Sequence, residues 1–111
     1  MSFHTVFIGW VLPLILIVLS IPLLLQKIPP NGVYGFRMSK TMSSDEMWYR
    51  ANKLGAMYFI GAGLFGLVVG MVAIFVWGDA YPKRVTNALA VLQSVSVAVA
   101  TLLWWLQVRK L

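Results

Sequence analysis

The side chains that could do chemistry are concentrated in one stretch of this sequence. Most of its charged residues fall between positions 27 and 53, namely Lys27, Arg37, Lys40, Asp45, Glu46, Arg50 and Lys53. The segments 1–26, 54–78 and 85–108 contain no Asp, Glu, Lys or Arg. Guanidinium groups bind carboxylates and phosphates through charge-assisted hydrogen bonds. The stretch therefore predicts a binding site, and we expect any specific function to lie there.

Catalysis and metal binding have few candidate residues. The chain contains one histidine, His4, three acidic residues and no cysteine, and His4 is far along the chain from Asp45 and Glu46. Neither a nucleophile with its base and orienting group nor a site of His and carboxylate ligands can be assembled from them. We predict that the protein is not an enzyme and uses no metal or cofactor.

Turn and aromatic signals fill the first half of the stretch. In the run Pro29-Pro30-Asn31-Gly32, the prolines are expected to end a helix, and Asn-Gly is a strong turn dipeptide because both residues tolerate positive φ. The run Val33-Tyr34-Gly35-Phe36-Arg37 places two aromatic rings around a glycine. We expect the rings at the level of lipid headgroups, with Arg37 held by a carbonyl at a helix end, Asp45 or Glu46.

A helix start follows. Ser43 is expected to cap it, with Glu46 three residues later closing a capping box. This short helix should run directly into the next apolar segment, with Glu46 and Arg50 paired at i, i+4. One of its faces carries Trp48, Asn52 and Gly55. We predict that Trp48 and Asn52 pack towards the helices; the alternative is that Trp48, Tyr49, Arg50 and Lys53 are ordinary anchors at the membrane interface.

The segments that must position this stretch are apolar and long. Residues 6–25, 56–77 and 88–106 each reach the ~18 apolar residues that can cross a hydrocarbon layer about 30 Å thick. With 60% hydrophobic and 11% charged residues, a soluble domain of 111 residues could not bury its apolar side chains. The sequence predicts an all-α membrane protein: one three-helix transmembrane domain over residues 1–111, with a structured loop, 27–55, between its first two spans.

Lys and Arg predict the topology. Seven of them fall in the loop and the C-terminal tail, against Lys83 and Arg84 on the other side. The positive-inside rule then places the N-terminus outside and the loop and C-terminus in the cytoplasm of a bacterial inner-membrane protein. Anionic headgroups account for the net charge of +6, so we expect membrane lipid and not nucleic acid as the partner of these cations.

Within the spans, the sequence predicts packing more than chemistry. Pro13 and Pro22 indicate a kink in the first helix. Small residues four apart predict close pairing of the second and third helices, or else a homo-oligomer seam; they are Ala62, Gly66 and Gly70, and Ala90, Ser94 and Ala98. The polar residues Gln93, Ser94 and Ser96 could line a small pore or make interhelical hydrogen bonds. No acidic residue lies in a span, which disfavours a proton-coupled transporter.

The run PPNGVYGFRMSKTMSSDEMWYRANKLGAMYFIGAGL combines an N-x-x-x-G-F-R turn, an acidic helix start and W-x-x-A-N-K. It resembles the signature of the SdpI family of bacterial membrane proteins, in detail over residues 29–64 and in three-helix layout over the whole chain. The resemblance makes characteristic positions of Asn31, Gly35, Phe36, Arg37, Trp48, Arg50 and Asn52. With Tyr34 beside them, these are the binding residues that we expect.

The resemblance implies immunity to a secreted toxin peptide and, in one branch, membrane sequestration of a transcriptional repressor. Characterised immunity proteins of that branch are longer, with further membrane helices ahead of this module. Binding of a peptide, lipid or partner protein at the cytoplasmic loop is therefore the more general expectation. Two alternatives remain open: a small oligomeric channel or transporter-like protein, and an accessory subunit of a membrane complex.

Overall fold

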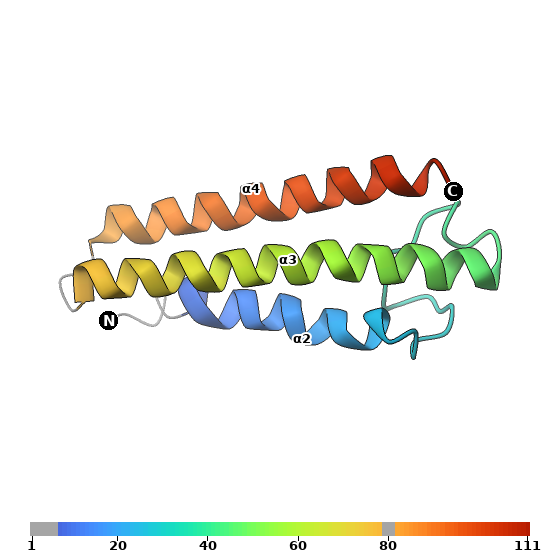
Figure 1. Ribbon diagram of the computed structural model, residues 1–111, viewed down its shortest axis with the longest axis horizontal. Helices are drawn as coiled ribbons and strands as arrows, with labels where there is room; N and C mark the ends of the chain where they lie inside the picture. Colours follow the sequence, from blue (N-terminus) through green and yellow to red (C-terminus); the bar gives the residue numbers. More distant parts are fainter. Residues whose placement is uncertain (1–6, 79–81) are drawn as a thin grey trace.

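Three helical rods run side by side along the molecule, as the computed structural model shows for residues 7–78 and 82–111 (Figure 1). The described elements are a π-helical turn η1 (Phe7–Val11) and the α-helices α2 (Leu12–Leu24), α3 (Asp45–Trp77) and α4 (Lys83–Val108). Helix α3 lies between α2 and α4, and η1 also contacts α4. No strand occurs in the described residues, so the predicted all-α class is confirmed.

Two of the predicted spans coincide with helices that could cross a membrane. Helices α3 and α4 are both long and apolar enough, whereas the apolar part of the first helix, Gly9–Leu24, is shorter. Large apolar side chains also point outwards, as at Phe75, which is 92% exposed. Such side chains suit contact with acyl tails rather than water. A crossing by the first helix stays a prediction.

The predicted short helix and second span form one continuous rod, α3. At 1.5 Å per residue its 33 residues extend about 50 Å, so about 20 Å would project beyond a 30 Å hydrocarbon layer. Its first turn carries Asp45 and Glu46, whose charges suit the positive end of the helix dipole. The far end of α3 leads into the connection to α4, while the loop and the C-terminus share the near end (Figure 1).

The predicted cap of α3 at Ser43 is wrong by one residue. Ser44 has the extended backbone of a cap, and its hydroxyl accepts from the Met47 amide at 3.1 Å. Ser43 instead donates from its hydroxyl to the Lys40 carbonyl at 2.6 Å. Glu46 consequently lies too early in the helix to close a capping box with its cap residue.

The first helix ends before the prolines that were expected to stop it. Helix α2 stops at Leu24, where Gln26 adopts a left-handed φ of 58°. The Gln26 amide bonds to the Leu23 carbonyl at 3.1 Å and the Lys27 amide to the Pro22 carbonyl at 3.0 Å. These two bonds make a Schellman motif, which satisfies carbonyls at the helix end without any help from Pro29 and Pro30. At the other end, Pro13 is the second residue of α2, which follows the π-helical turn η1.

The small residues of α3 face the first helix more than α4. A Cβ on Gly70 would lie 2.5 Å from the Gly9 carbonyl oxygen, and one on Gly63 would lie 2.6 Å from the Ile17 side chain. Gly66 makes room for the Gln93 side chain of α4, and a Cβ on Gly66 would lie 3.0 Å from the Pro13 ring. Glycine at these positions lets the helix backbones approach closely. Van der Waals contact between them is what drives helix association in lipid.

The matching stripe predicted on α4 is wrong, because Ser94 and Ala98 are exposed. The face of α4 that is buried instead comprises Thr86, Leu89, Gln93, Ala100, Trp104 and Val108. At Gly66 the large Gln93 side chain of α4 fills the space, so two small stripes need not meet there. A pattern of evenly spaced small residues therefore identifies the helix that carries the glycines, but not the face of the helix that packs against it.

Ser94 and Ser96 of α4 do not make the predicted interhelical hydrogen bonds. Ser94 donates to the Ala90 carbonyl at 2.8 Å and Ser96 to the Gln93 carbonyl at 3.0 Å, both within the same helix. The Gln93 side chain is 4% exposed, and its amide nitrogen has no hydrogen-bond partner in the described part of the chain. A pore lined by these residues stays a prediction.

Candidate functional site

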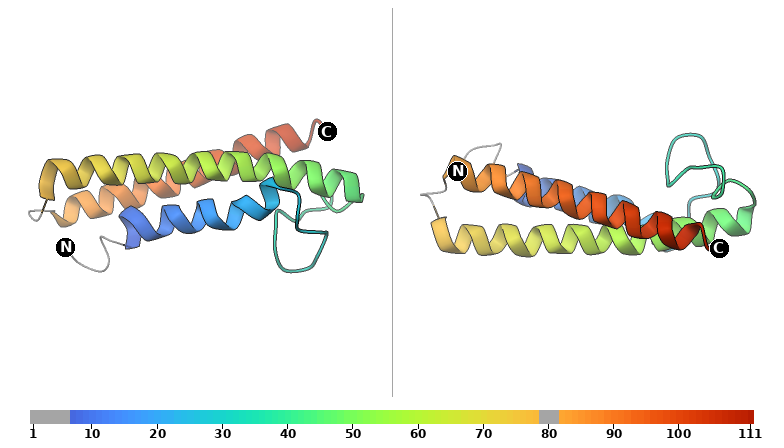
Figure 2. Two further views of the ribbon diagram at one scale, coloured as in Figure 1. Left: turned by 60° about the horizontal axis from the view of Figure 1, so that its bottom comes forward. Right: turned by 90° about the horizontal axis from the view of Figure 1, so that it is seen from above.

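The loop between α2 and α3 is folded, and it stays at one end of the bundle in every view (Figures 1 and 2). Asn31 organises its first half. The amide group of this side chain donates to the Pro29 carbonyl at 2.8 Å and the Tyr34 carbonyl at 3.0 Å, while its oxygen accepts from the Val33 and Tyr34 amides at 2.9 and 2.6 Å. The predicted turn is present, but Asn31 and Gly32 make it without positive φ. The asparagine side chain, rather than its backbone, makes this turn.

Asn52 holds the second turn of the loop against α3. Its side-chain oxygen accepts from the Phe36 amide at 2.6 Å, and its nitrogen donates to the Trp48 carbonyl at 2.9 Å and, weakly, to the Phe36 carbonyl at 3.4 Å. Asn52 is buried, so losing these bonds would leave buried polar groups unpaired. A carboxamide suits this position because it can pair with both the N–H and the C=O of one residue.

Trp48 connects the same helix turn to the start of the loop, just beyond the first helix. Its side chain is fully buried, and its indole N–H donates to the Ile28 carbonyl at 2.8 Å. Trp48 and Asn52 are buried as predicted, but their contacts are with the loop at Ile28, Gly35 and Phe36. Trp48 is thus a packed side chain and not a surface anchor at the membrane interface.

Gly35 is the point at which the loop comes closest to these two side chains. Its φ is +118°, a region that residues with a Cβ rarely adopt. A Cβ here would lie 2.8 Å from the Asn52 side-chain oxygen and 2.9 Å from the Trp48 ring. Both the backbone conformation and the available space therefore require glycine.

Phe36 fixes the loop to α3 and α4 together. Its ring lies over Gly55, where a Cβ would clash with it, and edge-on to Phe59 at a centroid distance of 4.8 Å. The Trp104 ring lies 5.1 Å away, and its indole N–H donates to the Ala51 carbonyl at 2.8 Å. Sequence reasoning missed Trp104, although its interval of four from Ala100 and Val108 placed it on the buried face of α4.

Two further contacts hold the remainder of the loop. Thr41, which sequence reasoning also missed, is fully buried; its hydroxyl accepts from the Met38 amide at 2.9 Å and donates to the Met38 carbonyl at 3.0 Å. The Lys40 ammonium donates to the Arg109 carbonyl at 3.3 Å, which connects the loop to the C-terminal end.

Tyr34 joins the loop to α2, because its hydroxyl donates to the Leu19 carbonyl. Burial raises the pKa of the Tyr34 phenol above 10.0, since desolvation disfavours the phenolate. The stabilisation associated with this shift is fully present below the ordinary pKa of tyrosine. It is lost as the pH rises through the raised pKa.

Arg37 and Arg50 are exposed, in contrast to the buried residues of the signature. In the described residues neither guanidinium has a hydrogen-bond or ion-pair partner, so the predicted anchoring of Arg37 and the predicted Glu46–Arg50 pair are both wrong. Water solvates exposed charges well enough that such pairs contribute little. Arg50 instead borders an open hollow of about 380 Å³ whose other lining residues are Gln26, Glu46 and Tyr49.

The loop therefore divides the expected binding residues into two groups. Asn31, Gly35, Phe36, Trp48 and Asn52 build its interior, whereas Arg37 and Arg50 carry charge on its outside. Free guanidinium groups can bind carboxylate, phosphate or carbonyl oxygens of another molecule. No cluster of three or more His, Cys, Asp or Glu suited to a metal ion occurs among the described residues.

Long apolar helices with a folded, cationic loop at one end are an arrangement typical of small membrane proteins. The chain belongs to the SdpI/YfhL protein family, whose model matches residues 27–106. The match begins after α2 and includes the loop, α3 and most of α4. No curated protein and no solved structure matches the chain. The family resemblance noted from the loop residues is confirmed.

Proposed function

We propose that this protein confers immunity to a toxic peptide or takes part in membrane signalling, by binding a peptide or partner protein at the loop 27–55. Neither turnover of a substrate nor transport is part of this function. The observation that carries the proposal is the division of the loop into a buried framework and an exposed cationic surface. Four buried or half-buried contacts hold it in place, at Asn31, Phe36, Trp48 and Asn52.

A prefolded loop favours binding because little conformational entropy is lost when a partner docks. Arg37 and Arg50 offer planar arrays of donors that no described residue occupies. A partner that presents carboxylates or a helix C-terminus would complement them. The hollow beside Arg50 also supplies the Glu46 carboxylate and Tyr49, which can bind a cationic or aromatic side chain.

The proposed topology has three spans, with the loop in the cytoplasm of a bacterial inner membrane. The loop and the C-terminus lie at the same end of the bundle (Figure 1), which supports counting their seven cations together. Lys83 and Arg84 lie at the opposite end, at the start of α4. The positive-inside rule then gives the loop and the tail the cytoplasmic side.

Cysteine labelling tests this topology without background, because the chain has no native cysteine. With Ser39→Cys, an impermeant maleimide should label the protein only after cells are permeabilised. Lys83→Cys, also exposed, is the matched site at the other end and should be labelled in intact cells. Labelling of Ser39→Cys in intact cells would reverse the assignment.

The binding proposal is tested by in-cell crosslinking followed by purification and mass spectrometry of the captured partner. Arg37→Gln and Arg50→Gln together should reduce capture at least about tenfold, since a charge-assisted hydrogen bond contributes about 1.5 kcal/mol or more. Thermal stability should change little, because both side chains are exposed. Gln93→Leu, deep in α4, is the matched control and should capture the partner as wild type does.

Two outcomes would contradict the binding proposal. One is undiminished capture by the double arginine variant. The other is loss of capture in Gln93→Leu alone, together with a solute or ion flux in proteoliposomes, which would indicate a pore.

A further inference from the structure

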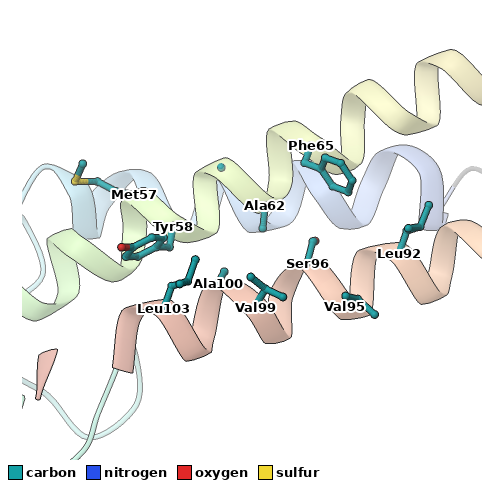
Figure 3. A pocket seen from close by; sticks show the side chains of 11 residues that line it. Met57, Tyr58, Ala62, Phe65, Leu92, Val95, Ser96, Val99, Ala100 and Leu103 are labelled. Atoms are coloured by element: carbon teal, nitrogen blue, oxygen red, sulfur yellow. The ribbon is translucent and has the colours of Figure 1, made fainter. Parts of the chain in front are cut away.

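Two open hollows of about 440 Å³ each follow the outer side of the contact between α3 and α4, and they meet at Leu92. The first lies towards the loop end, between Met57 of α3 and Leu103 of α4 (Figure 3). Its lining is apolar apart from Tyr58 and Ser96, and the Ser96 hydroxyl is bonded within its own helix. This hollow contains no charge that would select one occupant over another.

The second hollow differs because a cation stands at its end. Its α3 side includes Val69, Ala73 and Trp77, and its α4 side includes Arg84, Ala88 and Leu92. Trp77 ends α3 and Arg84 lies in the first turn of α4, so both are at the same end of the helical hairpin. In the described residues Arg84 is exposed and makes no hydrogen bond or ion pair.

The length of the second hollow matches one lipid chain. From Arg84 to Leu92 an α-helix rises about 12 Å, and half of a hydrocarbon layer is about 15 Å thick. Small side chains at Ala73 and Ala88 leave the space open along this length. A tryptophan beside the cation is typical of the level at which headgroups begin.

We propose that this second hollow binds an anionic phospholipid, with one acyl chain along α3 and α4 and the phosphate at Arg84. The apolar lining accounts for the chain, and the Arg84 guanidinium, which has no hydrogen-bond or ion-pair partner among residues 7–78 and 82–111, accounts for the negative headgroup. The site lies at the opposite end of the bundle from the loop. The proposal does not depend on the function proposed for the loop.

Native mass spectrometry of the purified protein in detergent can test the site. Phosphatidylglycerol and phosphatidylcholine with identical chains are titrated separately, and glycerol 3-phosphate is added as a headgroup without chains. One cation near an anionic surface contributes about fivefold in affinity. We therefore expect about fivefold tighter binding of phosphatidylglycerol than of phosphatidylcholine, and no retention of glycerol 3-phosphate.

Three variants separate the headgroup, the chain and the general charge. Arg84→Gln should make the two lipids equal, and Ala88→Trp should weaken both by filling the hollow. Arg109→Gln is the matched control, because Arg109 also lies beside a tryptophan, Trp105, at 5.0 Å, but borders neither hollow. Equal binding of both lipids by wild type, retention of glycerol 3-phosphate alone, or loss of the preference in Arg109→Gln would overturn the proposal.

Discussion

Replacing Trp48 by alanine is expected to lower the free energy of unfolding by about 3–5 kcal/mol, the range for a large aromatic side chain removed from a core. The indole is fully buried and contacts the loop at Gly35. Its N–H donates a hydrogen bond to the Ile28 carbonyl. The measurement is unfolding of the detergent-solubilised protein, followed by circular dichroism and by proteolysis of the loop. The loop should be cleaved faster than in wild type at temperatures where α3 and α4 stay helical.

The matched control for Trp48 is Trp105, whose side chain is 41% exposed and contacts Arg109. Trp105→Ala should cost less than about 1 kcal/mol, the upper range for an exposed cation–π contact. Trp48→Phe, which retains most of the ring but loses the N–H donor, should fall between the two alanine variants. Equal losses for Trp48→Ala and Trp105→Ala would show that the loop does not depend on a buried tryptophan.

Gly35→Ala is expected to destabilise the protein by at least about 2 kcal/mol, from backbone strain and from overpacking together. The new methyl group would meet the Asn52 side-chain oxygen at 2.8 Å while the backbone stays at a φ of +118°. Relief would require the loop to move away from Asn52, which breaks its bond to the Phe36 amide. Melting temperature and partner capture should therefore fall together.

Gly32→Ala supplies the comparison within the same loop. A Cβ at Gly32 would meet no atom within 4 Å, and the φ of this residue is not positive. The free energy of unfolding of Gly32→Ala should stay within about 1 kcal/mol of wild type. Alanine restricts the unfolded chain more than glycine does, which offsets small losses in the folded state. If both glycine variants melt at the same temperature, the close approach at Gly35 is not what fixes the loop.

Much of the loop could be anticipated from residue type and order. Trp48, Asn52 and Gly55 share one helix face, which indicated that Trp48 and Asn52 pack inwards, whereas the Phe36 ring was expected at the level of lipid headgroups. Both Trp48 and Asn52 are buried, and Phe36 fills the space beside Gly55. Long apolar runs likewise predicted α3 and α4, since length and composition suffice for such helices.

Other features depended on geometry that residue types do not specify. Ser43 and Ser44 are chemically equal caps, and only the extended backbone of Ser44 decides between them. The sequence offered several hydrogen-bond acceptors near Arg37. Solvation of an exposed guanidinium competes with hydrogen bonding to each of them. On α4, the rotation of the helix about its axis determined that Gln93 and Trp104 face inwards while Ser94 faces outwards.

Helix α3 connects the loop to the apolar part of the bundle without a break, and it contains no proline. It carries both the residues that contact the loop, Trp48 and Asn52, and the glycines that contact the first helix, Gly63 and Gly70. A molecule that displaces α3 through its loop contacts would therefore also displace the glycine contacts with the first helix. A continuous helix can in this way connect binding at the loop to the spacing of the helices.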